Sequence, residues 1–234
     1  MKLGVHQPNY APWCGYFAKI RACDVFVFLD DAEISTGQSY VYRTRVRSEN
    51  GPIWLSVPTH RALHESIGSV RFADRKWATK HRNRLQASYR LAPFFSEVFA
   101  ILEPIYDAPG ETLADFNIRL IRAIADYLGI HCRWERASSF AISETRDDRH
   151  VALAHAVGAD TYVSGKGGGK YQDPTVFDAA GVRLEVREYV AVPYPQVQGG
   201  KFEAGLSVLD AMFNVGGEAR SLLSYSSEAR EGQN

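Results

Sequence analysis

Three short segments of this 234-residue sequence carry side chains that could perform chemistry. The first is a turn that follows a short apolar run and reads His6-Gln7-Pro8-Asn9-Tyr10-Ala11-Pro12-Trp13. Proline fixes the backbone φ angle, so this turn is stiff enough to hold the His6 imidazole in one place. Such an imidazole can act as a general base or as a hydrogen-bond donor. A turn that only packs beneath an aromatic ring is the alternative.

The second segment is rich in glycine and reads Ser164-Gly165-Lys166-Gly167-Gly168-Gly169-Lys170-Tyr171. Glycines between a strand and a helix allow backbone N–H groups to approach an anion, and the two lysines add positive charge. The segment fits neither the P-loop pattern nor the dinucleotide fingerprint. An anion site, a flexible lid over an active site and a flexible loop without a ligand are all consistent with this composition.

The third segment is the carboxylate pair Asp30-Asp31, with Glu33 close behind. These carboxylates could bind a metal or orient His6, although acidic residues also commonly cap strand ends. Cys14 has no cysteine partner at metal-ligand spacing, so we expect no zinc site. A Cys14 thiol acting as a nucleophile near His6 is a weaker possibility.

The elements around the first and third segments predict a common location for them. Residues 2–6 and 24–29 are expected to be strands, and the apolar spacing of residues 13–22 is helical. Strand, helix and strand within thirty residues indicate a βαβ unit with parallel strands. Ligands of such sheets bind beyond the carboxyl ends of the strands. His6 and Asp30-Asp31 should therefore lie at the same edge of the sheet.

The rest of the chain predicts an α/β fold with a mainly parallel sheet flanked by helices. A hairpin is expected from residues 39–47 and 53–58, and Asp74 should cap a helix over 75–89 whose polar face presents Lys76, Lys80, His81 and Arg84. Further helices are expected at 113–128, 144–157, from Pro174 to Gly181, and at 207–214, with strands at 161–163 and 183–189. We predict one domain over residues 1–224, with an inserted basic β/α region at about 39–90 and a polar tail at 225–234.

Composition excludes several classes of protein. With 45% hydrophobic and 23% charged residues, the chain is neither disordered nor fibrous. Three cysteines at irregular spacing, and the absence of a signal peptide or a long apolar run, predict a reduced cytoplasmic protein with no membrane span. The net charge is zero, but residues 41–90 hold eleven basic and three acidic residues, a net charge of +8. This asymmetry suits an anionic partner such as a nucleotide, a nucleotide-linked sugar or RNA, although the overall pI of about 7.1 is not typical of nucleic-acid-binding proteins.

Six motifs in order give the sequence a family resemblance. They are HQPNYAPWCGYFAKI, DVFVFLDDAEIS, WLSVP, WATKH, GADTYVSGKGGGKYQD and LSVLDAMFNVGG, the last preceded by YPQ. Together they resemble the WbqC-like protein family over about residues 4–217. The resemblance implies a bacterial protein encoded among genes for surface-polysaccharide (O-antigen) or modified-sugar synthesis, with a proposed role in glycyl or other acyl transfer onto an amino sugar. It assigns no catalytic residue by itself.

From the residues and the resemblance together we expect an acyl or aminoacyl transferase, possibly glycyl-transferring, that acts on an amino sugar or related amine. The candidate catalytic residues are His6 as the base, Asp30 as its orienting partner, and His81. The candidate substrate-binding residues are Gln7, Tyr10, Trp13, Tyr16, Arg43, Arg45, Ser164, Gly165, Lys166, Gly168, Tyr171, Gln196, Asp210 and Asn214. The expected partner is a small phosphate- or nucleotide-linked molecule, with aminoacyl-tRNA as a possible donor, while the cofactor and the oligomeric state stay open. An ATP-dependent nucleotidyl-transferring or adenylate-forming enzyme and a non-catalytic carrier-binding module are the alternatives.

Overall fold

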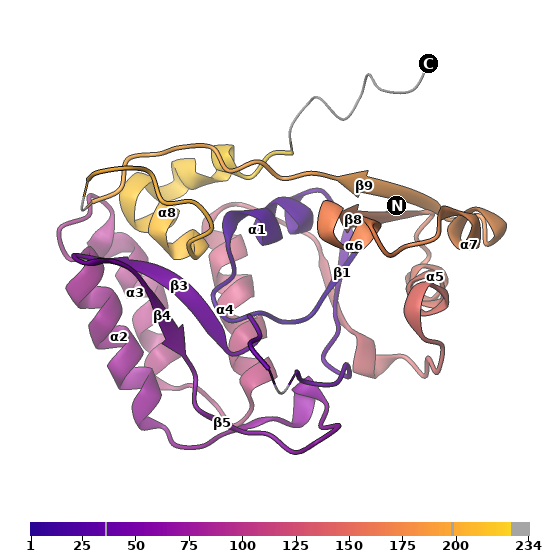
Figure 1. The fold of residues 1–234 in the computed structure, drawn as a ribbon, viewed down its shortest axis with the longest axis horizontal. Coiled ribbons are helices and arrows are strands. Elements are labelled where there is room, and N and C mark those ends of the chain that lie inside the picture. The colour runs from indigo at the N-terminus through magenta and orange to yellow at the C-terminus, as the bar shows by residue number, and fades with distance from the viewer. Residues whose placement is uncertain (36, 198, 226–234) are drawn as a thin grey trace.

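A five-stranded parallel sheet forms the centre of the molecule in the computed structural model, which describes residues 1–35, 37–197 and 199–225 (Figure 1). Its strands are β1 (Lys2–His6), β2 (Val25–Phe28), β7 (Arg133–Arg136), β8 (Thr161–Gly165) and β9 (Arg183–Arg187). They lie in the order β7-β2-β1-β8-β9, and His6 pairs in register with Phe28. The predicted α/β class and the parallel pairing of the first two strands are confirmed.

Helices cover both faces of this sheet because successive strand residues point to opposite sides. Leu3, Val5, Val25 and Val27 pack in one apolar cluster with α5 (Arg146–Val157) and α7 (Pro174–Ala179). The alternate residues Phe26 and Phe28 belong to a second cluster, with α1 (Cys14–Arg21), α4 (Leu113–Tyr127) and α8 (Val208–Val215). Figure 1 shows α5 and α7 on one side of the sheet, and α1, α4 and α8 on the other.

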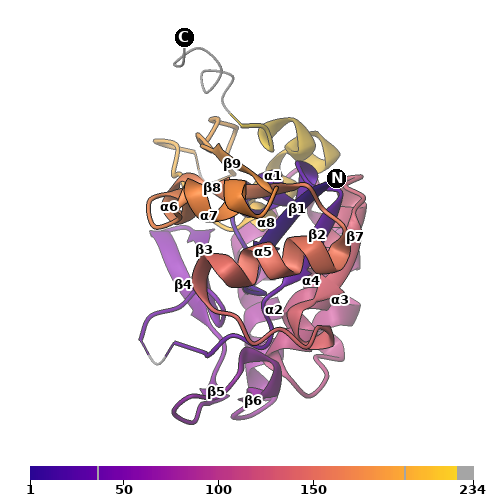
Figure 2. The same ribbon diagram turned by 90° about the vertical axis from the view of Figure 1, so that its right-hand side faces the viewer.

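Between β2 and β7 the chain leaves the sheet and builds the inserted region. It contains the antiparallel hairpin of β3 (Arg43–Ser48) and β4 (Gly51–Ser56), the short pair β5 (Thr59–His60) and β6 (Arg71–Phe72), and the helices α2 (Lys76–Tyr89) and α3 (Phe95–Asp107). Figure 2 shows the hairpin on the same side of the molecule as α6 (Lys166–Gly169). The inserted β/α region was predicted, but α3 and β7 were not.

Two of the predicted segments differ from the structure for local reasons. The first hairpin strand begins at Arg43 instead of residue 39, because the Ser39 Oγ accepts a hydrogen bond from the Val41 backbone N–H at 3.2 Å and closes a turn. The glycine-rich segment, predicted as a loop, folds into the one-turn helix α6 directly after β8. The expected domain boundaries stay predictions, and residues 226–234 of the expected tail lie outside the described part of the chain.

One predicted surface residue lies in the core. His81 was expected on the polar face of α2, but its exposed fraction is 8%. It shares a helical stripe with Trp77 and Leu85, four residues before and after it, and both of these are buried. The apolar stripe of the helix therefore carries His81 inward.

Candidate functional site

A cavity of about 700 Å³ opens at the carboxyl ends of β1 and β8. The order of the sheet reverses between these two strands, because the chain passes from β1 to β2 and β7 on one side and from β8 to β9 on the other. Open α/β sheets bind their ligands in the crevice at such a switch point. The cavity therefore lies where the fold itself favours a binding site.

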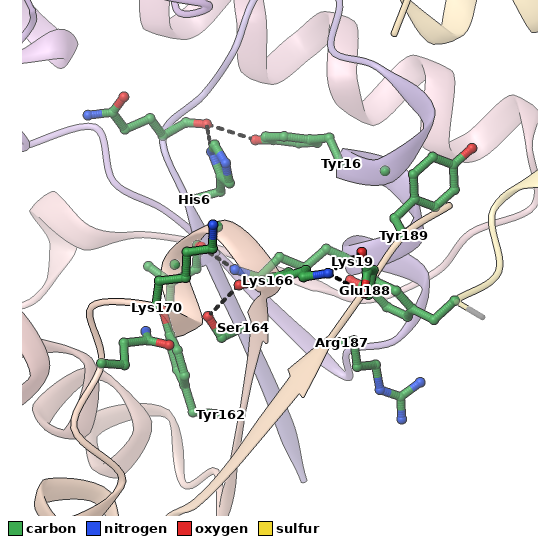
Figure 3. Close-up of a pocket in the computed structure, with 18 of the residues that line it drawn as sticks. His6, Tyr16, Lys19, Tyr162, Ser164, Lys166, Lys170, Arg187, Glu188 and Tyr189 are labelled. Carbon is green, nitrogen blue, oxygen red and sulfur yellow. Dashed lines mark hydrogen bonds and ion pairs between the residues drawn. The ribbon is translucent and has the colours of Figure 1, made fainter. Parts of the chain in front are cut away.

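His6 ends β1 and lines this cavity (Figure 3). Its Nδ1 lies 3.0 Å from the Gln7 carbonyl oxygen, which can only accept, so Nδ1 carries the proton and Nε2 keeps a lone pair. Burial, and to a smaller extent the charge of Lys19, lowers the pKa of His6 to about 4. The Tyr16 hydroxyl donates to the same carbonyl at 2.9 Å, and its ring meets the imidazole edge-on. At neutral pH, His6 is thus an uncharged and fixed proton acceptor.

Lys19 of α1 places a positive charge in the wall of the cavity. Its side chain is buried, and its Nζ donates to the Val5 carbonyl oxygen at 2.8 Å. Burial lowers the pKa of Lys19 to about 8, so the amine is still mostly charged at pH 7. An ammonium group has three N–H donors, and among the described residues the Val5 carbonyl oxygen accepts one of them. The remaining donors suit an anionic ligand.

The glycine segment forms the opposite wall. Ser164 is buried, and its hydroxyl donates to the Gly165 carbonyl oxygen at 3.3 Å. Lys166 forms an ion pair with Glu188 at 2.7 Å, whereas Lys170 has no ion pair within the described chain and points toward His6 in Figure 3. Lys19 and Arg187 also line the cavity, and Arg187 is ion-paired with Glu185. Of these four cations, Lys19 and Lys170 have no carboxylate partner among the described residues. The cavity is therefore suited to a negatively charged group.

Eight predicted site residues are brought together here. Those that line the cavity are His6, Gln7, Trp13, Tyr16, Ser164, Gly165, Lys166 and Gly168. The turn after β1 and the segment after β8 meet because their strands are neighbours in the sheet.

Asp30 lies at the predicted edge of the sheet but does not orient His6. Its carboxylate accepts hydrogen bonds from the Ser138 backbone N–H at 3.0 Å and from the Ser138 hydroxyl at 2.7 Å. An Arg136 nitrogen lies 3.8 Å from the same carboxylate. Because the Gln7 carbonyl already takes the His6 Nδ1 proton, the backbone performs the orienting task that was expected of Asp30.

Tyr10 and His81 belong to the core and not to the cavity wall. The Tyr10 hydroxyl lies 2.9 Å from His81 Nδ1 and 2.8 Å from the Tyr106 hydroxyl. Burial lowers the pKa of His81 to about 4. These two candidates therefore fix the turn that carries His6, and the structure gives them no direct route to a ligand in the cavity.

The other candidates are not among the residues that line the cavity. Gln196, Asp210 and Asn214 form one hydrogen-bonded group, in which Asp210 accepts from Gln196 at 2.8 Å and its backbone oxygen accepts from Asn214 at 2.7 Å. Tyr171 is 89% exposed. Arg43 and Arg45 stand on the hairpin.

Several lining residues were missed by the sequence analysis. They are Lys19, His150, Tyr162, Arg187, Glu188 and Tyr189. Lys19 left a signal, because it is the charged residue within the otherwise apolar helical stretch that ends at Ile20. His150 stacks on Tyr162 with ring centroids 4.9 Å apart, a contact between α5 and β8 that no local pattern reveals.

Within residues 1–35, 37–197 and 199–225, no group of three or more His, Cys, Asp and Glu side chains could hold a metal ion. None of the described helices is both long and apolar enough to cross a bilayer.

Comparison with known proteins gives the chain its family. The model of the WbqC-like protein family matches residues 7–222, nearly the whole chain. The chain belongs to the WbqC-like family. It is also similar to an uncharacterised protein of Mycobacterium tuberculosis, with 34% identity over 228 residues that cover 96% of this chain and 98% of the relative. No solved structure matches this chain. The matched range begins at Gln7, directly after His6, and it contains all the lining residues of the glycine segment.

Proposed function

We propose that this WbqC-like protein is an acyl or aminoacyl transferase that acts on the amine of a phosphate- or nucleotide-linked substrate such as an amino sugar. The observation that carries the proposal is His6, which is uncharged at neutral pH and lies in a cavity lined by four cations. Transfer to an amine requires a base near the attacking nitrogen and a positive site for the phosphates of the substrate. The cavity offers both, because His6 and the lysines line the same space.

In the proposed reaction the amine nitrogen attacks the carbonyl carbon of an acyl ester or thioester. A C–N bond forms, and the His6 Nε2 accepts the proton that the nitrogen loses. The C–O or C–S bond then breaks, and the proton passes from His6 to the leaving oxygen or sulfur. Lys19 and Lys170 would hold the phosphate, and the aromatic rings of Trp13 and Tyr16 would pack against the sugar.

The family resemblance supports this choice of substrate, because WbqC-like proteins are associated with the synthesis of surface polysaccharides. Acyl coenzyme A and aminoacyl-tRNA both carry the required carbonyl group, and the proposal leaves the donor open between them. The three cysteines are free, in keeping with the expected cytoplasmic setting, which stays part of this proposal.

The sheet order favours a second candidate, an ATP-dependent nucleotidyl-transferring or adenylate-forming enzyme. A parallel sheet whose order reverses beside its first strand is the arrangement of nucleotide-binding α/β folds. This likeness is one of fold, which hosts many activities. An uncharged His6 that keeps a lone pair is also a poor partner for phosphate oxygens, so we rank this candidate second.

Ligand-induced thermal shifts, followed by turnover assays, test the proposal. The purified protein is heated with ATP, with acetyl coenzyme A and with nucleotide-linked amino sugars. Stabilisation by a nucleotide-linked amino sugar supports the proposal and supplies the acceptor for the assay. Stabilisation by ATP alone, with pyrophosphate released when an amino acid is added, would establish the second candidate instead. Tight binding of one of these ligands without turnover, whichever donor is added, would indicate a non-catalytic carrier-binding module.

The variant His6→Gln then tests the base. Loss of a general base lowers kcat by about 10²- to 10⁴-fold. His64→Gln is the matched control, because His64 is exposed and pairs with Glu33 outside the cavity. Since the pKa of His6 is about 4, kcat/KM of the unaltered enzyme should show no loss through His6 between pH 7 and pH 5.5. An unchanged rate in His6→Gln would remove His6 from this role.

A further inference from the structure

A strip of aromatic and guanidinium side chains leads from the cavity onto the β3–β4 hairpin. The ring of Trp13, which lines the cavity, has its centroid 5.8 Å from that of Tyr40. Tyr40 in turn lies 5.8 Å from Trp54 of β4, and the Arg43 guanidinium carbon lies 4.1 Å from the Trp54 ring centroid. We call these four residues the hairpin strip.

Two rings of the hairpin strip are exposed to solvent, and Trp13 and Arg43 are half-buried. Tyr40 is 45% exposed and Trp54 is 44% exposed, although large aromatic side chains are usually buried. Contiguous exposed apolar surface of this kind marks interaction sites. The strip also continues directly into a cavity, so a ligand held there could extend from one into the other.

The hairpin strip carries a positive charge that no carboxylate in the described residues pairs with. Arg43 donates from Nη2 to the Gln38 side-chain oxygen at 2.8 Å, and its buried Nε has no hydrogen-bond partner there. Its neighbour Arg45, by contrast, is paired with Glu203 at 2.6 Å. The segment 41–90 around the hairpin has eleven basic and three acidic residues, so the wider surface also attracts anions.

We propose that the hairpin strip binds single-stranded RNA and directs its end into the cavity. Unpaired bases stack on aromatic rings and on guanidinium planes, and arginine pairs with the phosphates between them. Three neighbouring rings, and one guanidinium that has no carboxylate partner among the described residues, supply both kinds of contact. The identity of the donor rests on the proposed function: an aminoacyl ester at the end of an RNA would then be the acyl donor.

The geometry favours a single strand over two other ligands. The bases of a duplex are already stacked on one another, so flat exposed rings gain little from it. A neutral oligosaccharide could pack on Tyr40 and Trp54, but it has no negative charge to pair with the Arg43 guanidinium.

Fluorescence anisotropy with a 5′-labelled single-stranded RNA of twelve nucleotides tests the proposal without any turnover. We expect Trp54→Ala and Tyr40→Ala each to weaken binding about tenfold. Arg43→Gln should also reduce the slope of log affinity against log salt by about 0.7, the value for one phosphate contact on a single strand. Leu91→Ala removes a side chain that is 78% exposed, and Arg122→Gln removes an exposed charge of α4, so both are matched controls that should bind as the unaltered protein does.

Three results would overturn the proposal. The first is equal affinity for the duplex form of the same RNA. The second is equal RNA affinity of the strip variants and the controls. The third is binding of labelled maltohexaose without binding of the labelled RNA. The salt slope of Arg43→Gln keeps the test valid even if an aromatic variant folds poorly. Because binding is measured without a donor or an acceptor, a failure here leaves the role of His6 untouched, and a failure of His6→Gln to lower turnover leaves this binding site untouched.

Discussion

Three histidines of this chain share a lowered pKa for one physical reason, although they occupy different environments. His6, His81 and His150 each have a pKa of about 4, and burial is the largest cause in every case. His6 faces a cavity, whereas His81 is fixed inside the core by Tyr10. In the sequence, a strand end followed by prolines indicates His6 as a candidate site residue. Trp77 and Leu85, four residues to either side of His81, mark the apolar stripe of the helix and so also predict that His81 is buried.

The lowered histidine pKa values predict acid sensitivity of the fold. A histidine with a pKa of 6.5 when unfolded and about 4 when folded leaves the unfolded chain with more bound protons between these values. Stability is therefore level above about pH 7 and falls as the pH drops from 6.5 towards 4. For His81, which is 8% exposed, this difference corresponds to on the order of 3 kcal/mol.

Urea unfolding of the unaltered protein and of His81→Gln, between pH 7.5 and pH 4.5, measures this effect. The variant should start from lower stability and lose less of it on acidification, because one buried neutral histidine is gone. His64→Gln, altered at an exposed histidine, should lose as much as the unaltered protein. If His81→Gln has the same pH slope as the unaltered protein, the buried His81 is not a source of the acid sensitivity.

At the scale of elements, α6 owes its position to one glycine. A Cβ on Gly169 would lie 2.7 Å from Val186 Cγ1 of β9, closer than real Cβ contacts allow. A Cβ on Gly167 would meet nothing within 4 Å. The two glycines are two residues apart in the same short helix, yet of this pair only Gly169 is needed for packing against the sheet.

This difference predicts opposite effects of two alanine substitutions. Gly169→Ala should lower the free energy of unfolding by about 1–3 kcal/mol, because α6 must move away from β9. Gly167→Ala should be neutral or raise it by up to about 1 kcal/mol, since alanine is the better helix former. Urea titrations of both variants provide the measurement. A similar loss in both would mean that helix conformation, and not contact with Val186, limits this position.

The elements that were predicted share a strong local pattern. Apolar runs predict β1 and β2, and helical spacing predicts α1. Together these elements place His6 at the carboxyl-end edge of the sheet. β7 reads RWER and is an edge strand, so it has no continuous apolar run to reveal it. Likewise, sequence spacing cannot show that Lys19 and His150 reach one cavity, because α1 and α5 are brought together only by the sheet.

At the scale of the whole molecule, the segment between β9 and α8 ties the sheet to the inserted region. We call its described residues, 188–197 and 199–206, the strap. Tyr194 of the strap donates to Asp210 Oδ2 at 2.8 Å, and Tyr89 of α2 donates to Asp210 Oδ1 at 2.9 Å. Burial raises the pKa of Asp210, while these donors oppose that rise. One fully buried carboxylate thus joins the strap, α2 and α8.

A double-mutant cycle tests whether Asp210 acts as this junction. Hydrogen bonds to a charged group contribute about 1.5–3 kcal/mol, so Tyr89→Phe and Tyr194→Phe should each lower the free energy of unfolding by that amount. The double variant should lose less than the sum, because removing one donor raises the pKa of Asp210 further and the second donor then meets a more readily protonated carboxyl group. Tyr194→Phe with Tyr40→Phe is the control pair and should be additive, since Tyr40 is exposed and shares no partner with Tyr194 among the described contacts. Additive losses from Tyr89→Phe and Tyr194→Phe would show instead that the strap and α2 are held independently of each other.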